Sequence, residues 1–200
     1  MRTAIRSIVV ILLLSLELYA LYAVLRPRVS AEYRAYYIDH VTSDWHEPRY
    51  LATPQQGISF GKEGWPMFVE SSEGFAMPEG WGRWTDAALT PTAKIKMNTK
   101  FSGPLCIQFA AHPSDPELGQ TLQLALGDNV ADIKLSQSDY AVYQANFDHA
   151  NPADTLTFDL STVPPPINDL YPTSADGRRL GLALFWLKIL PGTCQQAHAS

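Results

Sequence analysis

The pattern of apolar and polar positions divides the chain into an N-terminal apolar run and a long region in which the two alternate. Residues 7–25 are apolar almost throughout, and Glu17 is their only charge. A helix rises about 1.5 Å per residue, so this run comes close to spanning the roughly 30 Å of hydrocarbon in a bilayer. The apolar part of a cleavable signal peptide is shorter, about 7–15 residues. We therefore expect a short tail over residues 1–6 and one uncleaved N-terminal transmembrane helix over residues 7–25.

The residues in and around this helix leave two questions open. Arg26 and Arg28 follow the helix, where a cleavage site needs small neutral residues, although residues 29–31 (Val-Ser-Ala) also fit a signal-peptide cleavage site. Glu17 is either a polar contact with a partner helix or a protonated residue that an otherwise apolar helix tolerates.

Charge favours one orientation of the chain in the membrane. Residues 36–200 carry 10 basic and 18 acidic side chains, which is not the basic excess of a cytoplasmic segment. The arginines that directly follow the helix argue for the opposite orientation. We expect a single-pass protein of a bacterial inner membrane with its C-terminal domain in the periplasm.

Beyond the helix, residues 26–56 are expected to form a juxtamembrane stalk, rich first in tyrosine and then in proline. From Ile58 onward the apolar positions recur with a period of two. The alternating stretches, separated by Gly, Pro and Asn, are residues 93–97, 105–109, 122–126 and 156–160. Short alternating strands with frequent turns are typical of antiparallel sandwiches. The predicted fold class is all-β, a jelly-roll-like antiparallel β-sandwich over residues 57–191, followed by a tail over residues 192–200.

Composition narrows the classes of function. The chain has 15 basic and 20 acidic residues and a net charge of −5, which argues against a nucleic-acid-binding surface. A mean hydropathy of −0.10 excludes a polytopic membrane protein. The two cysteines are Cys106 and Cys194. In an oxidising compartment they would form a disulfide that closes a long loop, but two separate thiols fit the sequence equally well.

Known catalytic signatures are absent from the sequence, which contains no nucleophile elbow, P-loop, HExxH or paired CxxC motif. No metal site and no cofactor are therefore expected, with one alternative, a structural calcium ion bound by oxygen-bearing residues of the turns. The candidates for that calcium site are Asp115, Glu117, Asp128, Asn129 and Asp132.

The most distinctive stretch is EGWGRWTD at residues 79–86, which is preceded by Trp65. Tryptophan rings offer flat apolar faces for stacking on sugar rings, and Arg and Asp side chains hydrogen-bond to ring hydroxyls, so the segment suits a carbohydrate platform. The alternative is a role in the core. Trp81 and Trp84 are three positions apart and face opposite sides of an extended strand, so at least one is expected in the core, with Arg83 in an ion pair.

This stretch and the later SADGRRLGLAL at residues 174–184 together resemble one family of β-sandwich domains. These domains are found attached to membrane phosphoglycerol transferases and to some surface-polysaccharide glycosyltransferases, and the similarity spans residues 58–190. The resemblance implies a jelly-roll-like sandwich and a setting in glycan assembly or decoration, without established catalytic residues. Because the chain lacks the transferase domain of the multidomain members, the resemblance implies an accessory role rather than an activity.

The leading hypothesis is a membrane-anchored, non-enzymatic accessory protein whose sandwich binds an envelope glycan or its lipid-linked precursor. One alternative is a structural partner that docks onto a membrane glycosyltransferase or phosphoglycerol transferase. Another is an enzyme that uses the carboxylates of Glu79 and Asp86. Because a charge near the interior needs a partner, Arg83 and Asp176 are expected to interact, directly or through one neighbour. The candidate ligand-binding residues are Trp65, Trp81, Arg83, Trp84, Asp86, Asp176 and Arg178.

Overall fold

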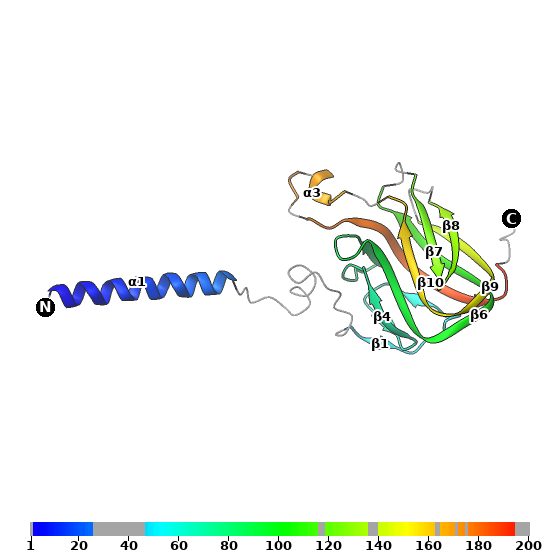
Figure 1. Ribbon diagram of the computed structural model, residues 1–200, viewed down its shortest axis with the longest axis horizontal. Helices are drawn as coiled ribbons and strands as arrows, with labels where there is room; N and C mark the ends of the chain where they lie inside the picture. The colour runs from blue at the N-terminus through cyan, green and yellow to red at the C-terminus, as the bar shows by residue number, and fades with distance from the viewer. Residues whose placement is uncertain are drawn as a thin grey trace. The chain divides into compact units, whose positions relative to one another are not determined.

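The computed structural model describes residues 2–25, 47–115, 119–135, 140–162, 165–170, 172–174 and 176–194. It contains two compact units, residues 1–34 and residues 35–200, which are described separately. In the first unit a single helix, α1, spans Arg2–Leu25 (Figure 1), as the apolar run predicts, and Glu17 is exposed on it. Among the described residues, no helix combines the length and the apolar character needed to cross a membrane. The transmembrane role of residues 7–25 stays a prediction.

The folded part of the second unit begins earlier than the alternating pattern suggests. Residues 26–46 of the predicted stalk lie outside the described residues, but the last part of that stalk packs on the sandwich. Strand β1 (Arg49–Tyr50) pairs in parallel with β3 (Trp65–Pro66). The guanidinium of Arg49 also donates a hydrogen bond to the carbonyl oxygen of Val69 at 2.7 Å. The end of the predicted stalk is therefore part of the folded domain.

Antiparallel strands make up most of this domain (Figure 1). They are β2 (Ile58–Ser59), β4 (Val69–Glu73), β5 (Arg83–Asp86), β6 (Thr92–Pro113), β7 (Thr121–Leu126), β8 (Asn129–Lys134), β9 (Ala141–Leu160) and β10 (Leu180–Pro191), with a short helix, α3 (Ile167–Leu170), before β10. The strands hydrogen-bond in the order β2-β10-β6-β9-β7-β8, and β4 adds to β6 while β5 adds to β10.

Two long strands, β6 and β9, take part in both layers of the sandwich. The first part of β6 pairs with β4 and with the end of β9, whereas its second part pairs with β10 and with the start of β9. The register shifts between Lys96 and Leu105, where Gly103 has a φ of 80°, and Figure 1 shows β6 as a long curved strand. We call β4, β7, β8 and the adjoining parts of β6 and β9 the β7 layer. Strands β2, β5, β10 and the other parts of β6 and β9 form the β10 layer.

The hydrophobic core lies between the β7 layer and the β10 layer. In β7, Leu122 and Leu124 are buried while Gln123 between them is exposed, as the period of two predicts. Phe158 of the β7 layer packs edge-on against Phe109 of the β10 layer, with ring centroids 6.3 Å apart. The antiparallel β-sandwich is confirmed, and the finer jelly-roll-like description stays a prediction.

Candidate functional site

The outer face of the β10 layer carries rows of side chains that cross three strands. On β10, Leu187 is buried in the core, so its neighbours Trp186 and Lys188 point to the other side of the sheet. The register places Lys188 beside Gln108 of β6, and Gln108 beside Gln144 of β9. One row of this face therefore presents an ammonium group followed by two amides.

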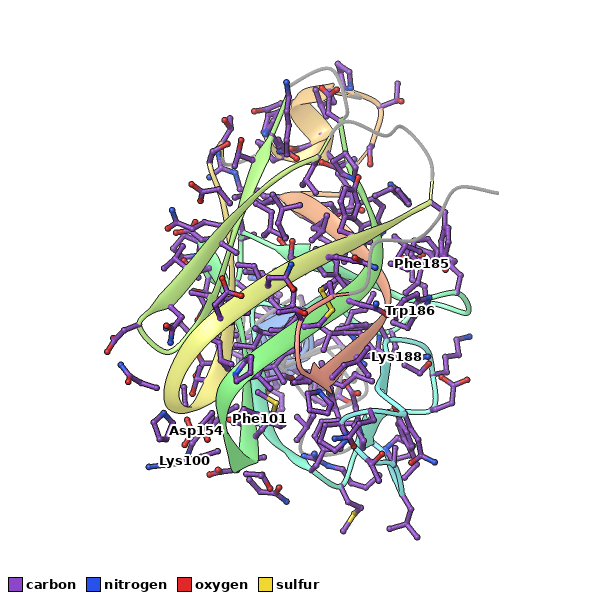
Figure 2. All side chains as sticks on the ribbon, turned by 90° about the vertical axis from the view of Figure 1, so that its right-hand side faces the viewer. Lys100, Phe101, Asp154, Phe185, Trp186 and Lys188 are labelled. Carbon is purple, nitrogen blue, oxygen red and sulfur yellow. A yellow bond between two sulfur atoms is a disulfide. The ribbon has the colours of Figure 1, made fainter. Side chains whose placement is uncertain are left out.

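An aromatic patch adjoins this row and consists of Trp81, Trp84, His112, Tyr140, Phe185 and Trp186. The ring of Phe185 lies 5.1 Å from Trp81 and 5.0 Å from Tyr140, measured between centroids. The indole N–H of Trp186 donates to the hydroxyl of Tyr140 at 2.8 Å. Trp81 is 39% exposed and Tyr140 52% exposed. Figure 2 shows Phe185, Trp186 and Lys188 following one another along β10, so the patch and the row of polar groups are continuous.

A β-bulge explains why two consecutive residues of β10 belong to the patch. Successive side chains of a regular strand point to opposite faces, yet Phe185 and Trp186 are both partly exposed. The register between β10 and β6 shifts between Leu184 and Trp186, which leaves Phe185 as the extra residue. Sequence reasoning missed Phe185, Trp186, His112 and Tyr140. The Phe-Trp pair inside a predicted strand was a signal, but a pattern of period two does not reveal the bulge that exposes both rings.

Both tryptophans of the WGRW segment lie in the patch, which corrects the expectation that one of them would be in the core. Strand β5 begins only at Arg83, so Trp81 belongs to the turn before it and not to an extended strand. Gly82 allows this turn to approach β10, because an added Cβ would overlap the carbonyl oxygen of Leu184. The rings of Trp81 and Trp84 then meet edge to face, 5.8 Å apart.

Arg83 and Trp65 are buried residues rather than surface contacts. Arg83 is 3% exposed, and its guanidinium donates to both carboxylate oxygens of Glu47 at 2.9 and 2.6 Å. The same guanidinium lies 4.7 Å from the ring centroid of Trp65, which is 1% exposed. The direct pair expected between Arg83 and Asp176 does not form, because Arg83 pairs with Glu47 of the predicted stalk instead. The other form of that expectation, an interaction through one neighbour, stays a prediction.

Asp86 has a structural role as well. It is 2% exposed, and one of its carboxylate oxygens accepts hydrogen bonds from the backbone N–H groups of Ala88 and Arg179, each at 2.9 Å. These bonds tie the end of β5 to the residues that lead into β10. The carboxylate of Asp86 is therefore buried and bonded to the backbone, and the alternative of an enzyme that uses Glu79 and Asp86 stays a prediction.

Asp176 and Arg178 pair with each other near the surface. Arg178 donates from Nε and Nη2 to the carboxylate of Asp176, with the shortest contact at 2.6 Å. These hydrogen bonds and the positive charge of Arg178 lower the pKa of Asp176 below its usual value. Arg178 also lies 3.9 Å from the carboxylate of Glu79. The two segments that carry the family resemblance therefore meet through Arg178 and Glu79.

Two hollows border the outer face of the β10 layer. The first, of about 320 Å³, lies beside Trp186 and is also lined by Tyr50 and Gln56. Burial raises the pKa of Tyr50, and its hydroxyl accepts a hydrogen bond from the backbone N–H of Ser59 at 2.8 Å. The second hollow, of about 180 Å³, is lined by Gln108 and by both cysteines. The face is thus a broad surface with shallow depressions rather than a deep pocket.

Cys106 and Cys194, which are 88 positions apart in the sequence, form a disulfide with their sulfur atoms 1.99 Å apart. This observation decides between the two alternatives that the sequence leaves open. The backbone N–H of Cys194 donates to the side-chain oxygen of Asn146 at 2.6 Å, which holds the segment after β10 against the outer face. Residues 192–194 of the predicted tail therefore belong to the domain, and residues 195–200 lie outside the described residues.

A metal site finds no direct support in the described part of the chain, where no group of three or more His, Cys, Asp or Glu side chains is arranged to hold an ion. Of the calcium candidates, Glu117 lies outside the described residues. Asp132 accepts a hydrogen bond from Gln123 at 3.2 Å, and Asn129 donates to the carbonyl oxygen of Leu126 at 3.3 Å. Structural calcium stays an untested alternative.

Comparison with known proteins found relatives of part of this chain. It is 25% identical over 134 residues to phosphoglycerol transferase I from Citrobacter koseri and from Escherichia fergusonii, which covers 66% of this chain and 17% of each relative. The chain therefore spans less than a fifth of the length of these curated relatives.

Similar solved structures include the C-terminal CBM6 of LamC, from Zobellia galactanivorans, with a TM-score of 0.39 and 12% identity over 67% of this chain and 97% of that one. A mutant of the family 29 carbohydrate binding module CBM29-2 has a TM-score of 0.42 and 15% identity over 68% of this chain and 91% of that one.

Residues 46–191 match the model of a family described as a domain of unknown function, DUF7024. The chain belongs to the DUF7024 family.

Proposed function

We propose that this chain is a membrane-anchored, non-catalytic accessory protein of envelope glycan assembly or modification, and that it binds a glycan on the outer face of the β10 layer. The observation that carries the proposal is the aromatic patch, together with the row of Lys188, Gln108 and Gln144 beside it. Contiguous apolar surface rimmed by polar groups marks an interaction site in a folded protein.

A sugar ring has the two kinds of surface that this face complements. The C–H groups of a pyranose form an apolar face, which packs on the exposed rings of Trp81 and Tyr140 and on the partly exposed ring of Trp186. Its hydroxyl groups need both donors and acceptors, and the side-chain amides of Gln108 and Gln144 supply both. Because the face is broad and its hollows are shallow, it suits an extended oligosaccharide better than a compact small molecule.

The cellular setting is part of the same proposal. Residues 7–25 of α1 would anchor the chain in a bacterial inner membrane, with Glu17 in contact with a helix of a partner. The disulfide between Cys106 and Cys194 supports an oxidising compartment such as the periplasm for the sandwich. The similarity to a part of phosphoglycerol transferase I supports a place beside a membrane transferase that acts on the same glycan.

The variants Trp81→Ala and Trp186→Ala, alone and combined, test this proposal. We expect each to weaken glycan binding about tenfold, since an aromatic contact of this kind contributes roughly 1.4 kcal/mol. Binding is measured by calorimetry with the full chain in a detergent without a sugar headgroup, after a glycan array has selected the oligosaccharide. Val130→Ala is the matched control, because Val130 is a 53% exposed apolar residue on the β7 layer. A wild-type chain that binds no glycan, or variants that bind as tightly as wild type, would contradict the proposal.

The aromatic patch also fits the docking alternative, because exposed Trp, Tyr and Phe side chains are enriched in protein interfaces. In that case the wild-type chain binds no glycan but co-purifies from membranes with a glycosyltransferase or phosphoglycerol transferase. Trp81→Ala would release that enzyme while Val130→Ala would retain it. Measuring glycan binding and co-purification with the same variants therefore distinguishes the glycan-binding proposal from the docking alternative.

A further inference from the structure

We propose that the glycan bound on this face is anionic, with phosphate or carboxylate groups, and that Lys188 binds the charged group. This inference rests on the proposed function, because it names the class of glycan for the same face. It adds a requirement for charge that stacking on aromatic rings does not impose.

Lys188 is placed to meet a ligand rather than a carboxylate of the protein. Its ammonium nitrogen lies 5.4 Å from the ring centroid of Trp186, a cation–π distance that holds it beside the aromatic patch. In the described part of the chain the salt bridges engage Arg83, Lys96 and Arg178, and none includes Lys188. The charge on Lys188 is therefore not neutralised by a neighbouring acid.

The row that contains Lys188 is rich in hydrogen-bond donors. Gln108 and Gln144 follow it across β6 and β9, and with strands about 4.8 Å apart the row is roughly 10 Å wide. An ammonium group has three donors and no acceptor, so it matches an acceptor-only group such as a phosphate or a carboxylate. The two amides would then bind the hydroxyl groups of the sugar that carries the anion.

The local charge of this face differs from the charge of the whole chain. The chain has a net charge of −5, which repels anions at long range. Three rows cross β10, β6 and β9 from Trp186, Lys188 and Leu190, and Lys188 is the one charged residue in them. An acid does border the face, because the carboxylate of Glu63 accepts a hydrogen bond at 3.0 Å from the hydroxyl of Ser59, the β2 neighbour of Trp186. Lys188 is the one cation of the three rows, and it attracts an anion by direct contact in spite of these acidic surroundings.

Calorimetric titration of the full chain, in a detergent without a sugar headgroup, tests this inference with three probes. They are a neutral gluco-oligosaccharide, the same oligosaccharide carrying phosphate esters, and the corresponding oligosaccharide of uronic acids. We expect at least one anionic probe to bind about tenfold more tightly than the neutral one at low salt, since a charge-assisted hydrogen bond contributes that much. The comparison between phosphate and uronate identifies the source of the charge, and added salt should reduce the preference.

Lys188→Gln should remove the preference for the anionic probe and keep the affinity for the neutral probe. Lys94→Gln is the matched control, because it removes the same charge from an exposed position of the β7 layer, and it should retain the preference. Equal binding of neutral and anionic probes by wild type, or a preference that survives in Lys188→Gln, would overturn this inference and leave the glycan-binding proposal intact. Absence of binding to every probe and to the glycan array would overturn the proposed function and this inference with it.

Discussion

The two outer faces of the sandwich share strands β6 and β9 but present different chemistry. On the β7 layer, Glu73, Lys94 and Thr157 form one row, and the ion pair between Lys96 and Glu70 is about half exposed, at 46% and 51%. The β10 layer instead exposes the aromatic patch. Both faces use the same two long strands, so the difference comes from the side chains that each face presents and from the β-bulge of β10 that exposes both Phe185 and Trp186. The charged groups of the β7 layer are well hydrated, so that face needs no partner. An exposed aromatic surface such as that of the β10 layer is typical of an interaction site.

The two layers also differ in how they are fastened. In the β10 layer, the buried ion pair of Arg83 with Glu47 connects the start of β5 to the segment before β1. The Cys106–Cys194 disulfide connects β6 to the segment that follows β10. The ion pair of Lys96 with Glu70 on the β7 layer lies in water, where such pairs contribute little. A surface that is already held rigid loses less conformational entropy when it binds a ligand. We therefore expect the ion pair and the disulfide to hold in place the face that is proposed to bind the glycan.

The largest effect is expected from the buried ion pair. Arg83→Met leaves the largely buried carboxylate of Glu47 without its partner and should lower the free energy of unfolding by about 3–5 kcal/mol. Lys96→Met on the β7 layer is the matched change and should cost less than about 1 kcal/mol, because water already solvates Lys96 and Glu70. Urea denaturation of both variants measures the difference. If both variants lose a similarly small amount of unfolding free energy, the ion pair of Arg83 does not stabilise the β10 layer.

The next largest effect is expected from the disulfide. The double variant Cys106→Ala/Cys194→Ala should lose about 2–4 kcal/mol of unfolding free energy, because the cross-link no longer restricts the unfolded chain. A reductant should destabilise the wild-type chain by a similar amount and leave the double variant unchanged. Urea midpoints with and without reductant provide the measurement. If the reductant acts equally on both proteins, the cysteines are not bonded in solution and the second fastening does not exist.

The smallest effect is expected from Asp176, in the segment that leads into β10. Its pKa is lowered in the folded chain by the hydrogen bonds from Arg178. A carboxyl of this kind stabilises the fold above its unfolded pKa and loses that contribution as the pH falls through its folded pKa. Stability should therefore fall below about pH 4, by less than about 1 kcal/mol because the pair is partly exposed.

Asp176→Asn should lack this part of the acid sensitivity, since an amide does not titrate in this range. Urea midpoints at about pH 6 and about pH 3 compare the two proteins. A loss in Asp176→Asn as large as that of wild type would show that Arg178 does not hold the Asp176 carboxylate in solution.

The candidate site was only partly visible in the sequence. Trp81 and Trp84 stand out by composition, and the structure places both in the aromatic patch. Trp65, Arg83 and Asp86 stand out for the same reason, but they are buried. A cluster of Trp, Arg and Asp residues stands out in the sequence, but residue type alone does not predict which of its side chains will be buried and which will be exposed.

The all-β class, the helix over the N-terminal apolar run and the family resemblance could be predicted from the sequence, because periodicity and motifs are local properties of neighbouring residues. The pairing of Glu47 with Arg83, 36 positions away, and the hydrogen bond from the backbone N–H of Leu182 to the hydroxyl of Thr85, 97 positions away, depend on the tertiary fold. The bulge that exposes Phe185 was decided in the same way, by the register of β10 against β6. Contacts of this kind depend on which strands become neighbours, and a local pattern holds no information about what lies across a sheet.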